Sequence, residues 1–69
     1  MNDDIIKGKW KEIKGQVRQQ WGKLTDDDVS KMQGSYEELS GHLQKTYGLK
    51  NDEANKQIDT FIDKFKDRD

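Results

Sequence analysis

An internal repeat is the feature that most constrains the fold of this chain. The segment GKWKEIKGQVRQQWG at residues 8–22 returns, altered, as GSYEELSGHLQKTYG at residues 34–48. A shift of 26 positions places three glycines on three glycines and two tryptophans on two tyrosines, and these six glycines are all the glycine in the chain. The repeat predicts a protein built from two similar units, approximately residues 8–33 and 34–59, within a single domain that covers residues 1–69.

The spacing of the apolar residues predicts helices in both units. Apolar side chains recur every three or four positions, which places them on one face of a helix. Helices are expected over about residues 4–21, over a short segment that ends near Gly34, over residues 35–47, and from residue 52 towards the C-terminus. No segment alternates with the period of two that marks a strand. The expected fold is therefore all-α, with four helices in two packed helical hairpins built from the internal repeat.

The composition indicates a small core. A chain of 69 residues with 29% apolar and 39% charged residues buries little apolar surface. Because there is no cysteine, neither a disulfide nor a thiolate zinc site can add stability. The few apolar side chains must therefore gather in one core that both hairpins share. Its expected members are Trp10, Ile13, Val17, Leu39, Leu43, Ile58, Phe61 and Ile62.

Helix boundaries are marked at equivalent positions of the two units. Gly22 and Gly48 follow the last apolar position of a long helix, where a left-handed residue would end it. Thr25 and Asn51 each precede acidic residues that favour the first turn of a helix, so we expect both to be N-caps. Helix capping also explains the aspartates at positions 26–28, because the segment lacks the glycine and the glutamate of an EF-hand loop.

Two glycines lie in the middle of expected helices, which is an unfavourable place for them. Gly15 and Gly41 project away from the apolar face, and glycine inside a helix costs about 0.5–1 kcal/mol relative to alanine. Either another backbone packs closely on this side, or the glycines are relics of duplication. We expect close approach at Gly41, because the second unit lies between the first hairpin and the last helix in the chain. We expect solvent exposure at Gly15.

Several short motifs in both units match the pattern of a known family. They are Gly8-Lys9-Trp10-Lys11, Lys14-Gly15 and Trp21-Gly22-Lys23-Leu24-Thr25-Asp26-Asp27-Asp28, with Gly34, Leu39, Gly41, Tyr47 and Gly48 in the second unit. The pattern resembles the CsbD-like family of small bacterial general stress proteins, and it covers nearly the whole chain. The resemblance implies a cytoplasmic bacterial protein made under general stress or in stationary phase, with a compact all-α fold. It brings no enzyme activity, cofactor or catalytic residue to this sequence.

A basic flank on the first helix is the one candidate binding surface. Lys7, Lys11, Lys14 and Arg18 fall in one arc beside the apolar face. Basic side chains near aromatic ones can hold phosphates and stack bases. The alternative is a solvated flank whose aliphatic stems cover the edge of the core. The second unit has acidic or neutral residues at the equivalents of the last three positions, so the repeated architecture does not require this basic flank.

The remaining polar residues form no recognisable catalytic or metal site. His42 is the only histidine, is expected on the surface, and has no cysteine with which to build a zinc or nucleophile site. The net charge of −1 does not point to nucleic acid or membrane, and no apolar run is long enough to span a bilayer.

We therefore expect a small cytoplasmic stress-response protein without enzymatic activity, cofactor or small-molecule substrate. It would act by weak macromolecular contact, as a monomer or a weak homo-oligomer. Two alternatives stay open. One is a nucleic-acid-binding module that uses the basic flank, and the other is a partner-binding or self-associating helical module.

Overall fold

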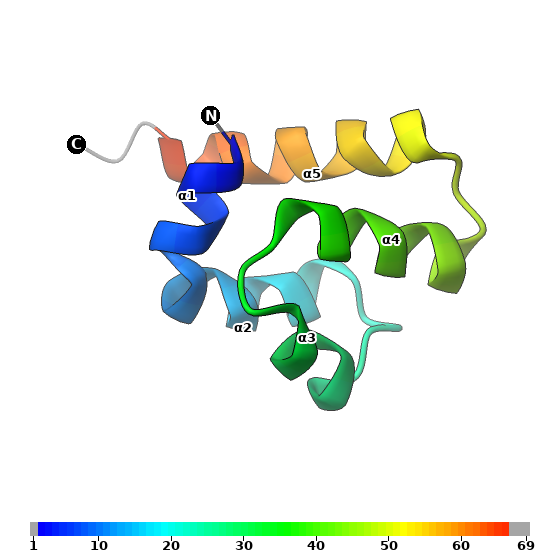
Figure 1. The fold of residues 1–69 in the computed structure, drawn as a ribbon, viewed down its shortest axis with the longest axis horizontal. Coiled ribbons are helices and arrows are strands. Elements are labelled where there is room, and N and C mark those ends of the chain that lie inside the picture. The colour runs from blue at the N-terminus through cyan, green and yellow to red at the C-terminus, as the bar shows by residue number, and fades with distance from the viewer. Residues whose placement is uncertain (1, 67–69) are drawn as a thin grey trace.

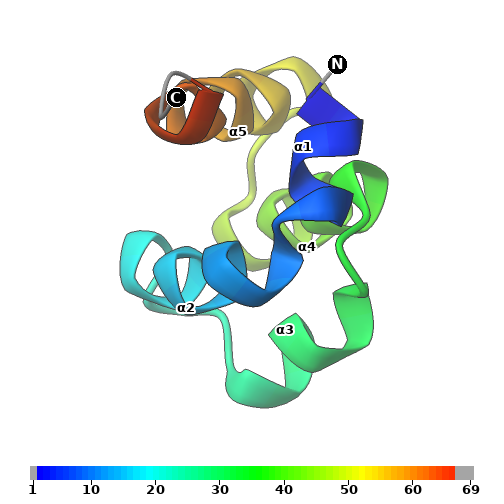
Figure 2. The same ribbon diagram turned by 90° about the vertical axis from the view of Figure 1, so that its left-hand side faces the viewer.

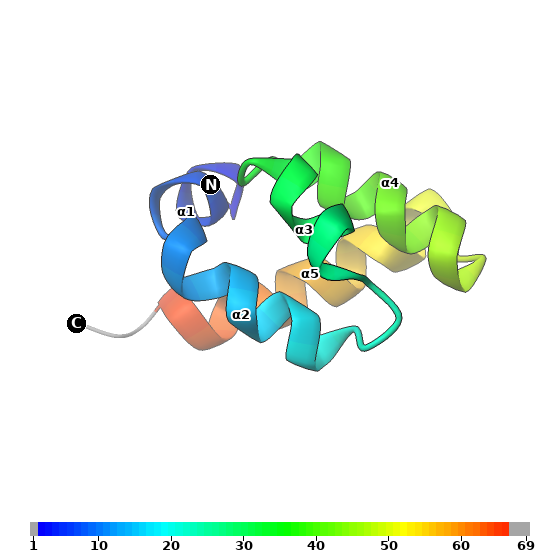
Figure 3. The ribbon, with the colours of Figure 1, turned by 90° about the horizontal axis from the view of Figure 1, so that it is seen from below.

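The structure is a computed structural model, and it describes residues 2–66. Each regular element in this part of the chain is an α-helix, as the sequence predicts. The helices are α1 (Asn2–Gly8), α2 (Trp10–Gln20), α3 (Asp26–Met32), α4 (Tyr36–Tyr47) and α5 (Asn51–Lys66). Helices α4 and α5 lie side by side and run in opposite directions (Figure 1), and α3 contacts both α2 and α4 (Figure 3). Within the described range, no helix has the length and apolar character needed to cross a membrane.

The first expected helix is divided in two, so residues 2–66 form five helices instead of the four expected. Lys9 has backbone angles of φ −114° and ψ 20°, which interrupt the helix. Its N–H donates to the Ile5 carbonyl at 3.0 Å, and its own carbonyl accepts from the Ile13 N–H at 2.9 Å. Figure 2 shows the change of direction between α1 and α2. Helix α1 packs against α4 and α5 whereas α2 packs against α3, and a straight helix could not reach both sets of partners.

The break is also tied to the far end of the chain. Lys9 Nζ donates to the Phe65 carbonyl at 3.2 Å, although the two residues are 56 positions apart. Phe65 lies in the last turn of α5, where carbonyls lack partners within the helix and positive charge is favoured. Lys9 therefore holds the junction of α1 and α2 against the end of α5.

One hydrophobic core joins the five helices. Its buried members are Ile6, Ile13, Val17, Trp21, Leu24, Val29, Met32, Leu39, Leu43, Ala54, Ile58, Phe61 and Ile62. The predicted core residues are all among them except Trp10, which is half-buried and packs against the core from outside. Trp10 differs because it lies against the turn between α3 and α4, where its side chain is next to Gly34.

The caps of α3 and α5 differ in position. The prediction for Thr25 is confirmed: its Oγ1 accepts from the Asp28 N–H, and Asp28 Oδ2 accepts from the Thr25 N–H, both at 3.1 Å. This is a capping box. The prediction for Asn51 is wrong by one residue, because Asn51 is already the first residue of α5. The Lys50 carbonyl accepts the first helical hydrogen bond, and Glu53 Oε1 accepts from the Lys50 N–H at 2.9 Å.

Close approach of the backbone occurs at a different glycine from the one expected. A Cβ at Gly41 would have no neighbour within 4 Å, so the expected approach there is wrong, whereas Gly15 is open as predicted. At Gly34, φ is +80° and a Cβ would meet Lys7 Cα and Trp10 Cβ at 3.2 Å. Only glycine suits this position. The absence of a side chain at Gly34 lets the α3–α4 turn pack closely against the end of α1 and the start of α2.

Candidate functional site

The structure divides the predicted basic flank between two helices. Lys7 lies on α1, whereas Lys11, Lys14 and Arg18 lie on α2, and all four are exposed. The break at Lys9 separates the first residue from the others. The three residues on α2 are spaced by three and four positions and therefore share one face of that helix. The flank is thus a cluster of three cations, with a fourth beyond the bend.

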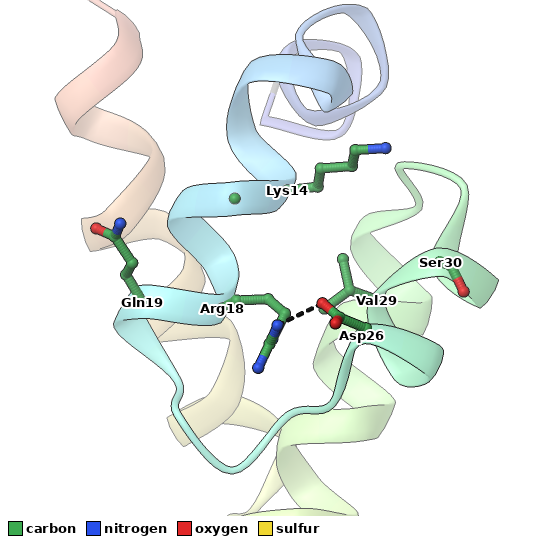
Figure 4. Close-up of a pocket in the computed structure, with 7 residues that line it drawn as sticks. Lys14, Arg18, Gln19, Asp26, Val29 and Ser30 are labelled. Atoms are coloured by element: carbon green, nitrogen blue, oxygen red, sulfur yellow. Dashed lines mark hydrogen bonds and ion pairs between the residues drawn. The ribbon is translucent and has the colours of Figure 1, made fainter.

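The cluster borders an open groove between α2 and α3, which we call the basic groove. Its volume is about 590 Å³, and it is lined by Lys14, Gly15, Arg18, Gln19, Asp26, Val29 and Ser30 (Figure 4). In Figure 4 the Lys14 side chain extends away from α2 on the side of α3, above Val29. The α2 backbone is uncovered at Gly15, because no atom lies within 4 Å of the place where a Cβ would stand.

The Arg18 side chain is already bonded to other residues of the protein. Its Nε donates to the Leu24 carbonyl at 3.2 Å, and its Nη1 forms a hydrogen-bonded ion pair with Asp26 Oδ1. These contacts connect the end of α2 to the loop and to the start of α3. The Arg18 and Asp26 side chains are 41% and 89% exposed, so water screens the pair and it adds little stability. Asp26 also lowers the attraction of the groove for anions.

The lining of the basic groove includes a positive charge at Lys14 and a hydroxyl at Ser30. Lys14 has no ion-pair partner among residues 2–66, so its ammonium group is available to a ligand. Ser30 is the one hydroxyl in the lining, and it donates to the Asp27 carbonyl at 3.0 Å. Nucleophilic catalysis needs a hydroxyl or thiol activated by a neighbouring base, whereas the Ser30 hydroxyl is bonded to a backbone carbonyl.

His42 faces the capping aspartate of α3, so the expected surface position is only partly correct. Its Nδ1 lies 4.0 Å from Asp28 Oδ1, and the two side chains are 30% and 32% exposed. The backbone hydrogen bond from Thr25 is the main reason that the pKa of the Asp28 carboxyl lies below its usual value. Across residues 2–66, no group of three or more His, Cys, Asp or Glu residues is placed to hold a metal ion.

A second polar cluster, which the sequence analysis missed, lies between α4 and α5. We call it the polar seam, and it consists of Tyr36, Ser40 and Gln44 on α4 with Asn51, Asn55 and Asp59 on α5. On each helix the three residues are four positions apart, which places them on one face. The spacing of four positions is the sequence signal that could have revealed the polar seam. It is a weak signal, because polar residues beside an apolar face are ordinarily solvated.

Hydrogen bonds connect the polar seam across the two helices. Ser40 Oγ donates to Asn55 Oδ1 at 2.7 Å and accepts from Gln44 Nε2 at 3.1 Å. Asn55 Nδ2 in turn donates to Asn51 Oδ1 at 3.1 Å. The buried hydroxyl of Ser40 is therefore satisfied on both sides, as a polar group in a protein interior must be.

Tyr36 closes the other end of the polar seam. Its hydroxyl lies 3.1 Å from the Asn55 carbonyl and 2.9 Å from Asp59 Oδ1, within donating distance of both. Burial, followed by the hydrogen bond to Asp59 and the charge of that carboxylate, raises the pKa of Tyr36 to about 12. The hydroxyl is therefore a protonated donor at neutral pH.

Together these features describe a small protein that is helical over residues 2–66, with a basic groove between α2 and α3 and a polar seam between α4 and α5. The model of the CsbD-like family matches residues 4–56, which is most of the chain. The protein belongs to the CsbD-like family, and the resemblance seen in its motifs is confirmed.

Relatives from three bacteria match most of the chain. The UPF0337 protein Bd3330 of Bdellovibrio bacteriovorus is 52% identical over 62 residues, which cover 90% of this chain and 67% of the relative. The UPF0337 protein YjbJ of Escherichia coli is 46% identical over 61 residues, 88% of each chain. The UPF0337 protein pc0632 of Protochlamydia amoebophila is 46% identical over 66 residues, 96% of this chain and 100% of the relative. No solved structure matches the chain.

Proposed function

We propose that the protein is a small cytoplasmic stress-response protein that acts through weak contacts with other macromolecules and catalyses no reaction. The role in a stress response rests on what membership of the CsbD-like family implies. The contact-based action is supported by the distribution of side chains. Thirteen apolar residues are buried in one core, while the chain carries 13 basic and 14 acidic residues.

A surface of this composition favours brief and reversible contacts. Charged side chains of both signs make the surface very hydrophilic, which disfavours aggregation, and they give weak attraction to many partners. Exposed charges are screened over about 8–10 Å at physiological salt, so such contacts form only at short range and weaken as salt is added. Specific recognition would need a larger apolar or well-packed patch on the surface.

Transverse ¹⁵N relaxation of the labelled protein tests this proposal. Relaxation in an extract of stressed cells would be compared with relaxation in glycerol solution of the same viscosity. We expect faster relaxation in the extract than in glycerol, and a return to the glycerol value on addition of salt. Equal relaxation in the extract and in glycerol would contradict the proposal, because no contact beyond viscosity would then be acting.

Nucleic-acid binding is a second candidate, and the basic groove is the observation that favours it. Lys11 and Lys14 are exposed on the same face of α2, and cations so placed can neutralise phosphates of a single strand. The engagement of Arg18 by Asp26 reduces the charge available. The groove therefore supports weak and strongly salt-dependent binding.

Fluorescence anisotropy of a labelled single-stranded oligonucleotide, measured over a range of salt concentrations, tests the second candidate. The double variant Lys11→Gln, Lys14→Gln should reduce the salt slope by about 1 for each phosphate contact that is lost. The variant Lys50→Gln, Lys56→Gln removes the same charge from exposed positions outside the groove and is the matched control. Equal slopes for the two double variants would exclude the groove as the contact site.

A further inference from the structure

The polar seam is not required by the repeated helical architecture. The shift of 26 positions aligns Asn55 with Val29, which is 3% exposed and belongs to the core. Ser40 is 4% exposed, and burial of a hydroxyl is unfavourable unless its hydrogen bonds are made. The second unit therefore has a buried hydroxyl at Ser40 and a half-buried amide at Asn55, whereas the equivalent positions of the first unit hold the exposed Lys14 and the buried Val29. Departures of this kind from the simplest packing are expected at functional sites.

An open groove of about 440 Å³ follows the outer side of the polar seam, and we call it the seam groove. It is lined by five residues of the seam, all but Asp59, together with Glu37 and Gly41. Gly41 is in the middle of α4, and no atom lies within 4 Å of the place where its Cβ would stand. A ligand can therefore approach the α4 backbone at this point, and a methyl group there would take up part of the space.

The side-chain amides of the seam groove are held in place and still have hydrogen-bonding capacity. A primary amide has two donor hydrogens and an acceptor oxygen with two lone pairs. Within the seam, Gln44 donates one hydrogen, Asn51 accepts through its oxygen, and Asn55 does both. The unused donors and acceptors belong to side chains whose orientation the inner bonds already fix. A site whose groups are fixed in advance loses less entropy when a ligand binds.

The lining selects for neutral ligands rich in hydroxyl groups. Glu37 is the only charged residue in it, so nothing there attracts an anion. A hydroxyl group both donates and accepts, and it therefore matches amides that have both kinds of capacity left. Tyr36 adds an aromatic ring, whose apolar face suits the C–H side of a sugar. We propose that the seam groove binds a neutral polyhydroxylated ligand of one or two sugar units, either free or as part of a polymer.

A purely structural role for the polar seam would require different features of the chain from those that ligand binding requires. Fixing the pairing of α4 with α5 would need the inner bonds between Ser40 and Asn55, but it would not need an open position at residue 41. Alanine at position 41 separates the two roles. Gly41→Ala replaces a glycine that is unfavourable in a helix, and the added methyl group contacts no neighbouring residue. The fold is therefore retained while the seam groove becomes narrower.

The proposal is tested by NMR titration of the ¹⁵N-labelled full chain with maltose, trehalose and N-acetylglucosamine, and separately with dextran. We expect at least one of these probes to give saturable shifts of the side-chain amides of Gln44, Asn51 and Asn55 and of the Gly41 backbone amide. Gly41→Ala should weaken binding by about tenfold, which corresponds to about 1.4 kcal/mol. Gly15→Ala makes the same change at the equivalent position of the first unit and should bind like the parent.

Each outcome has a defined meaning. Tighter binding of dextran per glucose unit than of maltose identifies a polymer as the source of the ligand, and the reverse identifies a free sugar. The proposal is overturned if no probe gives saturable shifts in the seam groove. It is also overturned if Gly41→Ala, with a thermal transition no lower than that of the parent, binds as well as the parent, or if Gly15→Ala weakens binding to the same extent.

Discussion

The two units of the repeat share a spacing of glycines and aromatic residues but place them in different surroundings. Trp21 is 3% exposed and packs on Phe61 in the core, with ring centroids 5.0 Å apart. Its equivalent, Tyr47, is half-buried, and its hydroxyl accepts a hydrogen bond from the Lys23 N–H at 3.1 Å. The aromatic residues thus fall at equivalent positions of the two segments along the chain. The neighbours supplied by the whole fold decide what each residue does.

The ends of the corresponding helices show the same difference. Gly48 has φ +68° and ends α4 in the left-handed conformation, as the sequence predicts. Gly22, within the described residues 2–66, does not have a positive φ, so it does not end α2 in the left-handed conformation as expected. The C-cap of α2 is Trp21. With the earlier start of α5 at Asn51, the two units do not match residue by residue. The arrangement as two equivalent hairpins built from the repeat therefore remains a proposal.

The largest expected loss of stability comes from truncation of Trp21, and it should exceed the loss from truncation of its equivalent, Tyr47. Trp21→Ala removes a buried ring and the hydrogen bond from Nε1 to Gln57 Oε1 at 3.0 Å, and it should lower the free energy of unfolding by about 3–5 kcal/mol. Tyr47→Ala should lower it less, because that ring is only half-buried. Chemical denaturation measures both values. Equal losses would mean that the two aromatic residues are equivalent after all.

A smaller difference in stability is expected between variants of the two predicted N-caps, Thr25 and Asn51. Thr25→Ala removes the side-chain half of a capping box and should cost about 0.5–2 kcal/mol. Asn51→Ala should cost less than this, because Asn51 lies inside α5 and accepts only from the Asn55 amide. Thermal unfolding of both variants checks the difference. A larger loss for Asn51→Ala would restore the cap that the repeat predicts.

Acid should weaken the cap of α3 through Asp28. The pKa of this carboxyl lies below its usual value in the folded protein, mainly because of the hydrogen bond from the Thr25 N–H. Its contribution to stability is therefore present above the unfolded pKa and is lost as the pH falls through the lower folded pKa. The aligned residue in the second unit is Ala54, which cannot titrate. Unfolding measured from about pH 5 to pH 2 should show a shallower loss for Asp28→Asn than for the parent.

The smallest expected effects are equal in the two units. Gly15→Ala and Gly41→Ala should each raise the free energy of unfolding by about 0.4–1 kcal/mol, because alanine favours the helix and restricts the unfolded chain. Both positions are open, with no atom within 4 Å of an added Cβ. Destabilisation by Gly41→Ala in a concentration-dependent manner would instead indicate an interface with a second copy of the chain.

Features that depend on local pattern could be predicted from the sequence. The apolar spacing gave the all-α class and most of the core, and the Thr25 cap follows from residues three positions apart. The break at Lys9 could not be predicted, because the spacing of Ile6 and Trp10 continues across it. It exists because α1 and α2 pack against different helices.

The candidate sites were predictable only as separate residues. Lys14 and Arg18 were expected beside the apolar face, but the pairing of Arg18 with Asp26 depends on how the loop after α2 folds back. The polar seam depends on the pairing of α4 with α5, since Ser40 and Asn55 are 15 positions apart. Neither contact follows from the pattern of a single helix.

The free energies of unfolding of Gly8→Ala and Gly34→Ala, measured side by side, show whether the surroundings of a residue or its position in the repeat decides its role. The repeat makes the two glycines equivalent, but Gly8 is open whereas Gly34 has φ +80° and its Cβ would meet Trp10 Cβ at 3.2 Å. We expect Gly34→Ala to destabilise the protein, because of the clash and the left-handed backbone, and we expect no destabilisation from Gly8→Ala. Changes of the same sign and size would show that position in the repeat, and not the surroundings, decides the role of a residue.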